Sequence, residues 1–153
     1  MTGRAFNVVL KRWIATFKSK PSRISNAASV VFFVATKPDN PIVVMGYYTL
    51  RTLSIELNQL PEKLARKLPK HPVPAALIGR LATCNAAQGQ GVGKLLLADA
   101  IKRTLAVSDQ IAIYVMVVDA INDNAKGFYE QFGFTRLNDN SPRLFLPLKS
   151  VSL

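Results

Sequence analysis

The segment Gln88–Lys94 constrains the fold more than any other part of the chain. A continuous apolar run, Val73–Cys84, precedes it and predicts a buried strand, while Lys94–Ala106 carries apolar residues at helical spacing. A glycine-rich turn that opens a helix leaves backbone N–H groups without intrahelical partners at the positive end of the helix dipole. The sequence therefore predicts a strand–turn–helix unit with a site for a phosphate or a pyrophosphate.

The spacing of the glycines decides between the known phosphate loops. A P-loop needs Ser or Thr after its Gly-Lys pair to hold magnesium, but Leu95 follows Gly93 and Lys94. A dinucleotide loop needs a third glycine where Lys94 stands. The remaining pattern is Gln-x-x-Gly-x-Gly, formed by Gln88, Gly91 and Gly93. The alternative is a turn that only begins a helix and binds nothing.

A second informative segment follows further along the chain, from Asn122 to Gly133. Asn122 is a candidate N-cap of a helix, and Gly133 can adopt the left-handed conformation that ends one. Asn122, Ala125 and Tyr129 are spaced i, i+3, i+7 and therefore share one helical face. Tyr129 either lines a site on this face or packs in the core as an amphipathic residue, and the spacing alone leaves both alternatives open.

Composition predicts one compact domain over residues 1–153. The chain has 153 residues, 49% of them hydrophobic, which is enough to bury a core. Its single cysteine, Cys84, excludes an internal disulfide and favours a reducing compartment. Because His71 is the only histidine, neither Cys–His catalysis nor a zinc site is expected. No apolar run suggests a membrane span or a signal peptide, so we expect a cytoplasmic protein without a metal.

Positive charge is concentrated in the first half of the chain. Residues 1–80 contain 13 Lys and Arg and three Asp and Glu, whereas residues 81–153 contain seven Lys and Arg and six Asp and Glu. This asymmetry, within a net charge of +11, favours a polyanion such as nucleic acid as a partner. A solvated surface or an acidic protein partner is the alternative. The basic residues form two clusters, Lys11, Arg12, Lys18, Lys20 and Arg23, and then Lys63, Arg66, Lys67 and Lys70.

The remaining elements predict an α/β layered domain. Apolar β-branched runs indicate strands, Pro and Gly clusters indicate turns, and a proline can begin a helix. In chain order we expect a helix at Phe6–Phe17 with Trp13 in the core, a basic loop through Arg23, strands at Ser29–Thr36 and Ile42–Leu50, a short helix from Pro61, a strand at Gln110–Val118, and final strands near Phe134 and at Leu144–Leu148.

The glycine loop and the Asn122 segment, in this order, resemble the GNAT acetyltransferase superfamily. The resemblance implies an α/β fold with a mixed central sheet, two splayed strands and flanking helices. It implies acetyl-coenzyme A as co-substrate and Tyr129 as the catalytic residue that protonates the departing thiolate. The coenzyme-binding residues that it implies are Leu81, Ala82, Thr83, Gln88, Gly89, Gln90, Gly91, Gly93, Lys94 and Asn122.

Further motifs narrow the resemblance to one branch. These are Gly46–Leu50, Leu60-Pro61, Leu68–Pro74, Ile78–Ala82, Val118–Ala120 and Arg143–Pro147. The segment from about Trp13 to the C-terminus is similar to toxins of bacterial type II toxin–antitoxin pairs. These toxins usually have an additional strand before the first helix, and an acid where this chain has Cys84.

The branch implies that the protein acetylates the amino group of aminoacyl-tRNA and blocks translation in the bacterial cytoplasm. It implies a ribbon-helix-helix antitoxin, operator DNA bound through the antitoxin complex, and a homodimer. The tRNA-binding residues that we expect are Arg80, Lys18, Lys20, Arg23 and Lys67. Two alternatives remain: a GNAT enzyme that acetylates protein or small-molecule amines, and an inactive homologue that only binds antitoxin and DNA.

Overall fold

The structure is a computed structural model that describes residues 17–23, 29–37 and 39–151. The predicted helix Phe6–Phe17, with Trp13, lies outside the described residues except for Phe17 itself. So do Lys11 and Arg12 of the first basic cluster.

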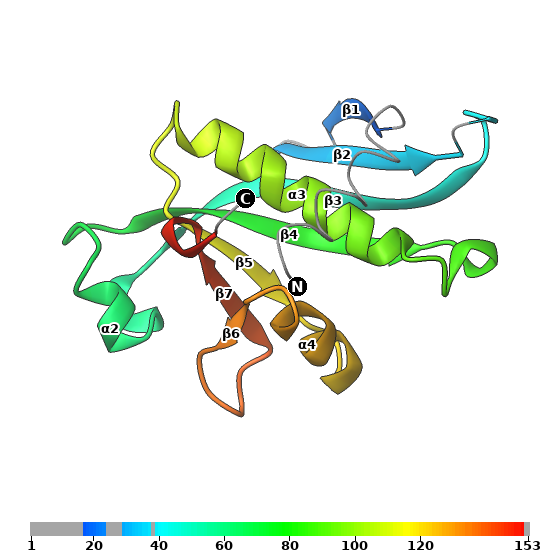
Figure 1. Ribbon diagram of the computed structural model, residues 1–153. Helices are drawn as coiled ribbons and strands as arrows, with labels where there is room; N and C mark the ends of the chain where they lie inside the picture. The colour runs from blue at the N-terminus through cyan, green and yellow to red at the C-terminus, as the bar shows by residue number, and fades with distance from the viewer. Residues whose placement is uncertain (1–16, 24–28, 38, 152–153) are drawn as a thin grey trace. The chain divides into compact units, whose positions relative to one another are not determined.

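The described strands form one mixed sheet in the order β1-β2-β3-β4-β5-β7-β6 (Figure 1). Neighbouring strands β4 and β5 are joined through a helix, the crossover that parallel strands require. The elements are β1 (Phe17–Arg23), β2 (Ser29–Thr36), β3 (Val44–Ile55), η2 (Leu57–Gln59), α2 (Glu62–Ala65), β4 (Val73–Thr83), η3 (Asn85–Ala87), α3 (Val92–Ser108), β5 (Val115–Asp119), α4 (Asp123–Glu130), β6 (Thr135–Arg136), β7 (Arg143–Pro147) and η4 (Leu148–Ser150).

The fold comprises two compact units. Unit one consists of the described parts of Thr52–Leu77 and Thr104–Leu153, and unit two of the described parts of Thr2–Arg51 and Ile78–Arg103. Strand β4 contributes its first residues to unit one and its last residues to unit two. The glycine loop therefore belongs to unit two, and Tyr129 belongs to unit one.

The core of unit one lies around β5 and β7. These strands pair antiparallel from Val115 opposite Pro147 to Asp119 opposite Arg143. Val115–Val118 are all buried, as expected for a central strand that is covered on both faces. Their core cluster comprises Ile55, Leu60, Val73, Ala75, Leu77, Val115, Val117 and Phe145.

Unit two is built on antiparallel pairing of β1 with β2 and of β2 with β3. The β2–β3 register shifts between Ala35 and Thr36, so a bulge bends this pair next to its turn. The backbone N–H of Cys84 donates to the Met45 carbonyl at 2.8 Å, which ties the end of β4 to β3.

The prediction of a basic loop through Arg23 is wrong. Lys18, Lys20 and Arg23 lie in β1, which pairs with Ser29–Ala35 of β2. An apolar strand such as β2 leaves a row of backbone hydrogen-bonding groups that need partners. The polar β1 supplies them as the outermost strand, where lysines and a proline such as Pro21 are tolerated.

Other boundaries shift by a few residues. Strand β3 continues to Ile55 instead of ending at Leu50, and β5 begins at Val115 instead of Gln110. The residues before Val115 are needed to return from the end of α3 at Ser108 to the sheet. The predicted strands at Ser29–Thr36 and Val73–Cys84 are confirmed within one residue.

Candidate active site

The glycine loop adopts a conformation that only glycine takes readily. Gly89 and Gly91 both have φ of +79°. A Cβ atom added at either position would meet no atom within 4 Å, so the requirement is conformational and not steric crowding. The same open space leaves room for a ligand to approach the backbone.

The first turn of α3 presents backbone N–H groups without partners. The helical hydrogen bonds begin where the Leu95 N–H donates to the Gly91 carbonyl at 3.2 Å. Within the described residues, the N–H groups of Gly91, Val92, Gly93 and Lys94 donate to no other group. These groups and the positive end of the helix dipole form a site for an anion. Gly91, Gly93 and Lys94 are among the predicted coenzyme-binding residues, whereas Val92, which begins the helix and whose side chain is buried, is not.

The side chains of the loop are used to hold the loop itself. Buried Ala87 and Val92 anchor its two ends. The side-chain amide of Gln88 donates to Asn85 Oδ1 at 3.2 Å, and that of Gln90 donates to the Ala86 carbonyl at 3.3 Å. The predicted coenzyme contacts of Gln88, Gly89 and Gln90 stay predictions, and the side-chain hydrogen bonds of Gln88 and Gln90 indicate a role in shaping the loop.

The end of β4, where Leu81, Ala82 and Thr83 were predicted to bind the coenzyme, packs closely against β3. A Cβ atom on Gly46 would lie 2.7 Å from the Ala82 carbonyl oxygen and 2.9 Å from Leu96 Cδ1. Gly46 is therefore required so that β3 can approach both β4 and the first turns of α3. This contact positions the strand end and the loop helix within one unit.

A buried polar cluster, which the sequence analysis missed, holds α3 against β2 and β3. The fully buried Tyr48 donates its hydroxyl hydrogen bond to Asp99, and Arg103 Nε donates to the same carboxylate at 2.8 Å. Burial and the Asp99 carboxylate both raise the pKa of Tyr48, so its hydroxyl stays protonated. The ring of Phe33 stacks on Tyr48 at 4.9 Å, and the Arg103 guanidinium lies 4.5 Å from the Phe33 ring centre. The only local signal was the i, i+4 spacing of Asp99 and Arg103.

In unit one, the predicted Asn122 cap is confirmed. Asn122 Oδ1 accepts a hydrogen bond from the Ala125 N–H at 2.8 Å, and α4 begins at the next residue. Gly133 has φ of +93° just beyond the end of α4, as predicted for a glycine stop. Because the cap uses the oxygen of the Asn122 amide, its nitrogen is the atom that could serve a ligand.

Tyr129 is a buried side chain whose hydroxyl reaches the surface. Its exposed fraction is 7%, and its ring contacts Phe128 and Phe134 edge-on, with centroids 5.2 and 5.7 Å away. Among the described residues, the hydroxyl has no hydrogen-bond partner, and no fully buried side-chain N or O atom lacks one. The hydroxyl must therefore be accessible. Burial raises the pKa of Tyr129, so the group stays protonated at neutral pH and can donate a proton.

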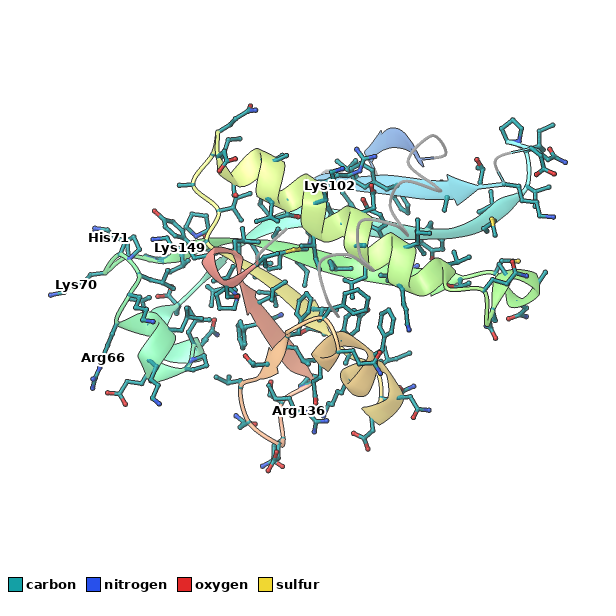
Figure 2. The ribbon with its side chains drawn as sticks, in the orientation of Figure 1. Arg66, Lys70, His71, Lys102, Arg136 and Lys149 are labelled. Atoms are coloured by element: carbon teal, nitrogen blue, oxygen red, sulfur yellow. The ribbon has the colours of Figure 1, made fainter. Side chains whose placement is uncertain are left out.

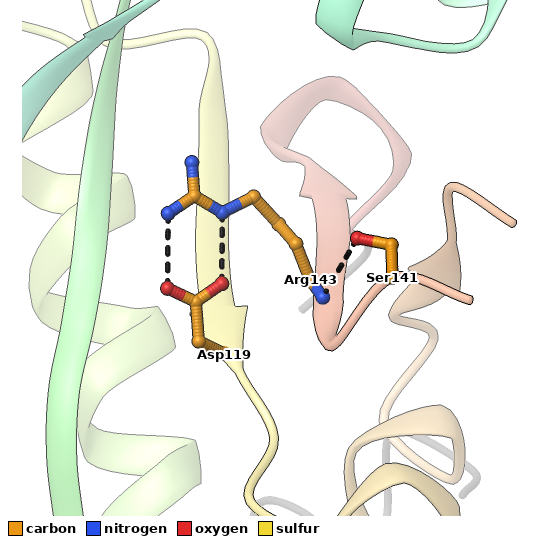
Figure 3. Close-up of polar contacts among 3 residues, drawn as sticks. All are labelled: Asp119, Ser141 and Arg143. Carbon is orange, nitrogen blue, oxygen red and sulfur yellow. Dashed lines mark hydrogen bonds and ion pairs between the residues drawn. The ribbon is translucent and has the colours of Figure 1, made fainter. Parts of the chain in front are cut away.

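A paired acid and base fix the turn that leads into α4. Arg143 Nε and Nη2 donate to the two carboxylate oxygens of Asp119 at 2.8 and 2.9 Å, and the Arg143 N–H donates to Ser141 Oγ at 3.2 Å (Figure 3). Asp119 ends β5 and Arg143 begins β7, so this bidentate pair clamps the strand ends just before Asn122. It accounts for two of the motif segments, Val118–Ala120 and Arg143–Pro147.

The predicted tRNA-binding residues fall in both units. Arg80 is exposed in β4 and belongs to unit two, as do Lys18, Lys20 and Arg23 of β1. Lys67 follows α2 in unit one, where Figure 2 shows Arg66, Lys70 and His71 at the same end of that unit. Each unit therefore carries part of the basic surface.

No group of three or more His, Cys, Asp or Glu side chains among the described residues is arranged to hold a metal ion. Among the same residues, no helix is long and apolar enough to cross a membrane.

Comparison with known proteins supplies a family. Residues 28–136 match the model of the acetyltransferase (GNAT) domain. The chain is 32% identical over 143 residues to a probable toxin TacT of Sinorhizobium fredii, covering 88% of this chain and 78% of that protein. It is 38% identical over 108 residues to a tRNA-acetylating toxin of Mycobacterium tuberculosis, covering 71% of this chain and 64% of that protein.

Solved structures of toxins are similar as well. AtaT in complex with acetyl-methionyl-tRNAfMet matches with a TM-score of 0.69 and 33% identity, over 80% of this chain and 72% of that one. A mutant AtaT bound to acetyl-CoA and the C-terminus of the antitoxin AtaR matches with a TM-score of 0.63 and 29% identity, over 79% of this chain and 69% of that one. The KacTA–DNA complex matches with a TM-score of 0.66 and 29% identity, over 96% of this chain and 81% of that one. The fold is the GNAT fold, and the chain belongs to the GNAT acetyltransferase family.

Proposed function

We propose that this protein is the toxin of a type II toxin–antitoxin system, which transfers acetyl from acetyl-CoA to the amino group of aminoacyl-tRNA and so blocks translation. The main support for the proposal is the row of backbone N–H groups without partners from Gly91 to Lys94, in a loop where Gly89 and Gly91 adopt the left-handed conformation. A diphosphate is the ligand that such a helix start accommodates. The similarity to tRNA-acetylating toxins supports the choice of acceptor.

The donor would bind mainly through the backbone. The N–H groups of Gly91, Val92, Gly93 and Lys94 hold the pyrophosphate, and Gln88, Gly89 and Gln90 keep the loop in shape. Backbone groups of Leu81, Ala82 and Thr83 at the end of β4 hold the pantetheine arm and stabilise the negative charge on the reacting carbonyl oxygen. Acetyl-CoA supplies the acetyl group as a thioester.

The reaction needs a neutral amine and a proton donor. An α-amino group has a pKa near ~8, so a useful fraction of the acceptor is neutral at cellular pH without a strong base. Tyr129 stays protonated because it is buried, and its accessible hydroxyl donates a proton to the leaving sulfur. The Asn122 amide, fixed at the start of α4, would contact the coenzyme arm close to that sulfur.

The remaining partners belong to the same proposal. Arg80, Lys18, Lys20, Arg23 and Lys67 would contact the tRNA. A ribbon-helix-helix antitoxin would bind the protein, and the joint complex would bind operator DNA; the similarity to toxin–antitoxin–DNA complexes supports this part. We further propose that the chain forms a single domain over residues 1–153, works as a homodimer and acts in the bacterial cytoplasm.

Transfer of labelled acetyl from acetyl-CoA tests the function directly. We expect label on charged tRNA and none on uncharged tRNA or on peptides, and a Tyr129→Phe variant should lose most of this transfer. Label on peptides or small amines alone would favour a different GNAT acceptor. Binding of antitoxin without transfer to any acceptor would favour the inactive homologue.

A further inference from the structure

Unit one carries a surface pocket in which only Lys67 has a role in the proposed function. The pocket has a volume of about 460 Å³ and lies between α2 and the segment that follows β7. Its lining combines apolar and aromatic side chains with lysines. The lining residues are Lys63, Leu64, Lys67, Leu68, Tyr114, Pro147, Lys149 and Ser150.

The pocket is strongly positive. No acidic residue lines it, and within the described part of the chain Lys63, Lys67 and Lys149 form no ion pair. The neighbouring acid Glu62 does not compensate them, because its carboxylate is paired with Arg66. Figure 2 shows Lys149 on η4, and Arg66 close to α2. Three lysines without counter-charges around one concave site favour an anionic ligand.

The aromatic wall of the pocket is held in place from both sides. The backbone N–H of Tyr114 donates to the Pro74 carbonyl at 3.1 Å, and the Tyr114 carbonyl accepts from the Leu148 N–H at 3.0 Å. On the opposite wall, the Lys67 N–H donates to the Leu64 carbonyl at 3.0 Å. These backbone contacts fix the chain positions from which the Tyr114 ring and the Lys67 side chain line the pocket.

We propose that this pocket binds one unpaired nucleotide of the tRNA, with its base against Tyr114 and its flanking phosphates at Lys63, Lys67 and Lys149. Single-stranded nucleic acid is bound by this combination of an aromatic platform and cations along the backbone. A duplex would use the charges, but its paired and stacked bases would not reach the Tyr114 ring, whereas an unpaired nucleotide offers both a phosphate and a free base. The proposal deepens the proposed function, since it takes tRNA as the substrate.

The position of the pocket separates its role from the chemistry. Tyr114 and Tyr129 both belong to unit one. Tyr114 immediately precedes β5, whereas Tyr129 lies in α4, the helix that comes after the other end of β5. A five-residue strand spans roughly 15 Å. The pocket should therefore raise the affinity for tRNA without changing the turnover of bound tRNA.

A charge-matched pair of variants tests the phosphate contacts. We would measure tRNA binding to the full chain without acetyl-CoA, for Lys63→Ala/Lys149→Ala, two pocket lysines without another assigned role, and for Lys37→Ala/Lys102→Ala, whose two lysines are exposed in unit two. We expect about ten-fold weaker binding for the pocket variant, with a salt slope smaller by roughly 1.4, since each single-strand phosphate contact contributes about 0.7. Equal losses in both variants would overturn the site, because only net charge would then matter.

A second pair of variants tests the aromatic platform. Stacking of one base on an aromatic ring contributes enough to change affinity by about ten-fold. Tyr114→Leu should weaken tRNA binding by this factor, whereas Tyr114→Phe should bind like the wild-type chain. Thermal unfolding of both variants controls for the partly buried position of the ring. Two folded variants with equal affinity would contradict base stacking.

Steady-state kinetics separate this proposal from the proposed function. In the pocket variants, KM for aminoacyl-tRNA should rise about ten-fold while kcat stays the same. If the wild-type chain binds tRNA through the pocket but acetylates another amine, the proposed function fails and the pocket stands. If the pocket variants acetylate tRNA normally and instead lose affinity for the antitoxin, the pocket is a protein-binding surface and our inference is wrong.

Discussion

The glycine loop of unit two and the helix α4 of unit one present their functional groups in opposite ways. In the loop, the side chains of Gln88 and Gln90 bond to the loop itself, and the backbone N–H groups are left for a ligand. In α4, the backbone is capped by Asn122, and the Tyr129 hydroxyl is left for a ligand. The loop should therefore tolerate side-chain changes that keep its conformation, whereas α4 should not tolerate the loss of one oxygen atom.

Removal of that oxygen gives the largest expected effect. Tyr129→Phe keeps the ring contacts with Phe128 and Phe134 but removes the proton donor. We expect kcat to fall by about 100- to 10,000-fold, the usual contribution of a general acid, with acetyl-CoA affinity unchanged. Acetyl transfer assays give kcat, and calorimetry gives the affinity for acetyl-CoA. Turnover close to that of the wild-type chain would assign the proton to another group.

The packing beneath the loop should be the next most sensitive feature. Gly46→Ala places a methyl group 2.7 Å from the Ala82 carbonyl oxygen, a contact that backbone must move to relieve. Overpacking of this kind costs about 1–3 kcal/mol, so thermal unfolding should shift down by several degrees. Gly79→Ala is a milder comparison, because the atom it approaches is a Thr49 side-chain oxygen. Unchanged stability of Gly46→Ala would mean that β3 and β4 are not held this closely.

A pair of glycine variants tests conformation against crowding. Gly91→Ala forces a Cβ into the left-handed region, at a cost of about 1–2 kcal/mol, so acetyl-CoA should bind about ten-fold more weakly. Gly127→Ala, inside α4 and with open space around its Cβ, should instead stabilise the fold by about 0.5–1 kcal/mol. Equal coenzyme affinity of Gly91→Ala and the wild-type chain would show that the loop conformation does not matter for binding.

The smallest expected effect comes from variants of Asn122, which separate its role as the cap of α4 from its proposed contact with the coenzyme arm. Asn122→Ala should cost about 1 kcal/mol through loss of the cap, and Asn122→Asp should restore that stability because aspartate caps as well. If the amide nitrogen contacts the coenzyme arm, Asn122→Asp will remain less active although it is stable. Full activity of Asn122→Asp would limit Asn122 to capping.

Local patterns in the sequence were sufficient to predict the glycine loop and the helix α4. The glycine spacing predicted the turn before α3, and the Asn122 cap and the Gly133 stop predicted the ends of the α4 segment, because each depends on residues close together in the chain. The strand β1 was missed because Lys18 and Lys20 alternate with polar residues and have no apolar pattern. Only its pairing with β2 makes it a strand.

The buried cluster of unit two could not be predicted for a different reason. Tyr48 and Asp99 are 51 residues apart, and neither residue's neighbours indicate that the two will meet. The pocket of unit one could not be predicted for the same reason, because it brings together Lys67, which follows α2, and Lys149 in η4. Patterns of a few residues predict elements, whereas contacts between distant elements need the fold.

Calorimetric titration of acetyl-CoA into the purified chain shows whether the N–H groups at the start of α3 bind the diphosphate of the coenzyme. We expect saturable binding by the wild-type chain, about ten-fold weaker binding by Gly91→Ala and unchanged binding by Tyr129→Phe. Absence of binding to the folded wild-type chain, or equal binding by the Gly91→Ala variant, would contradict this role of the N–H groups.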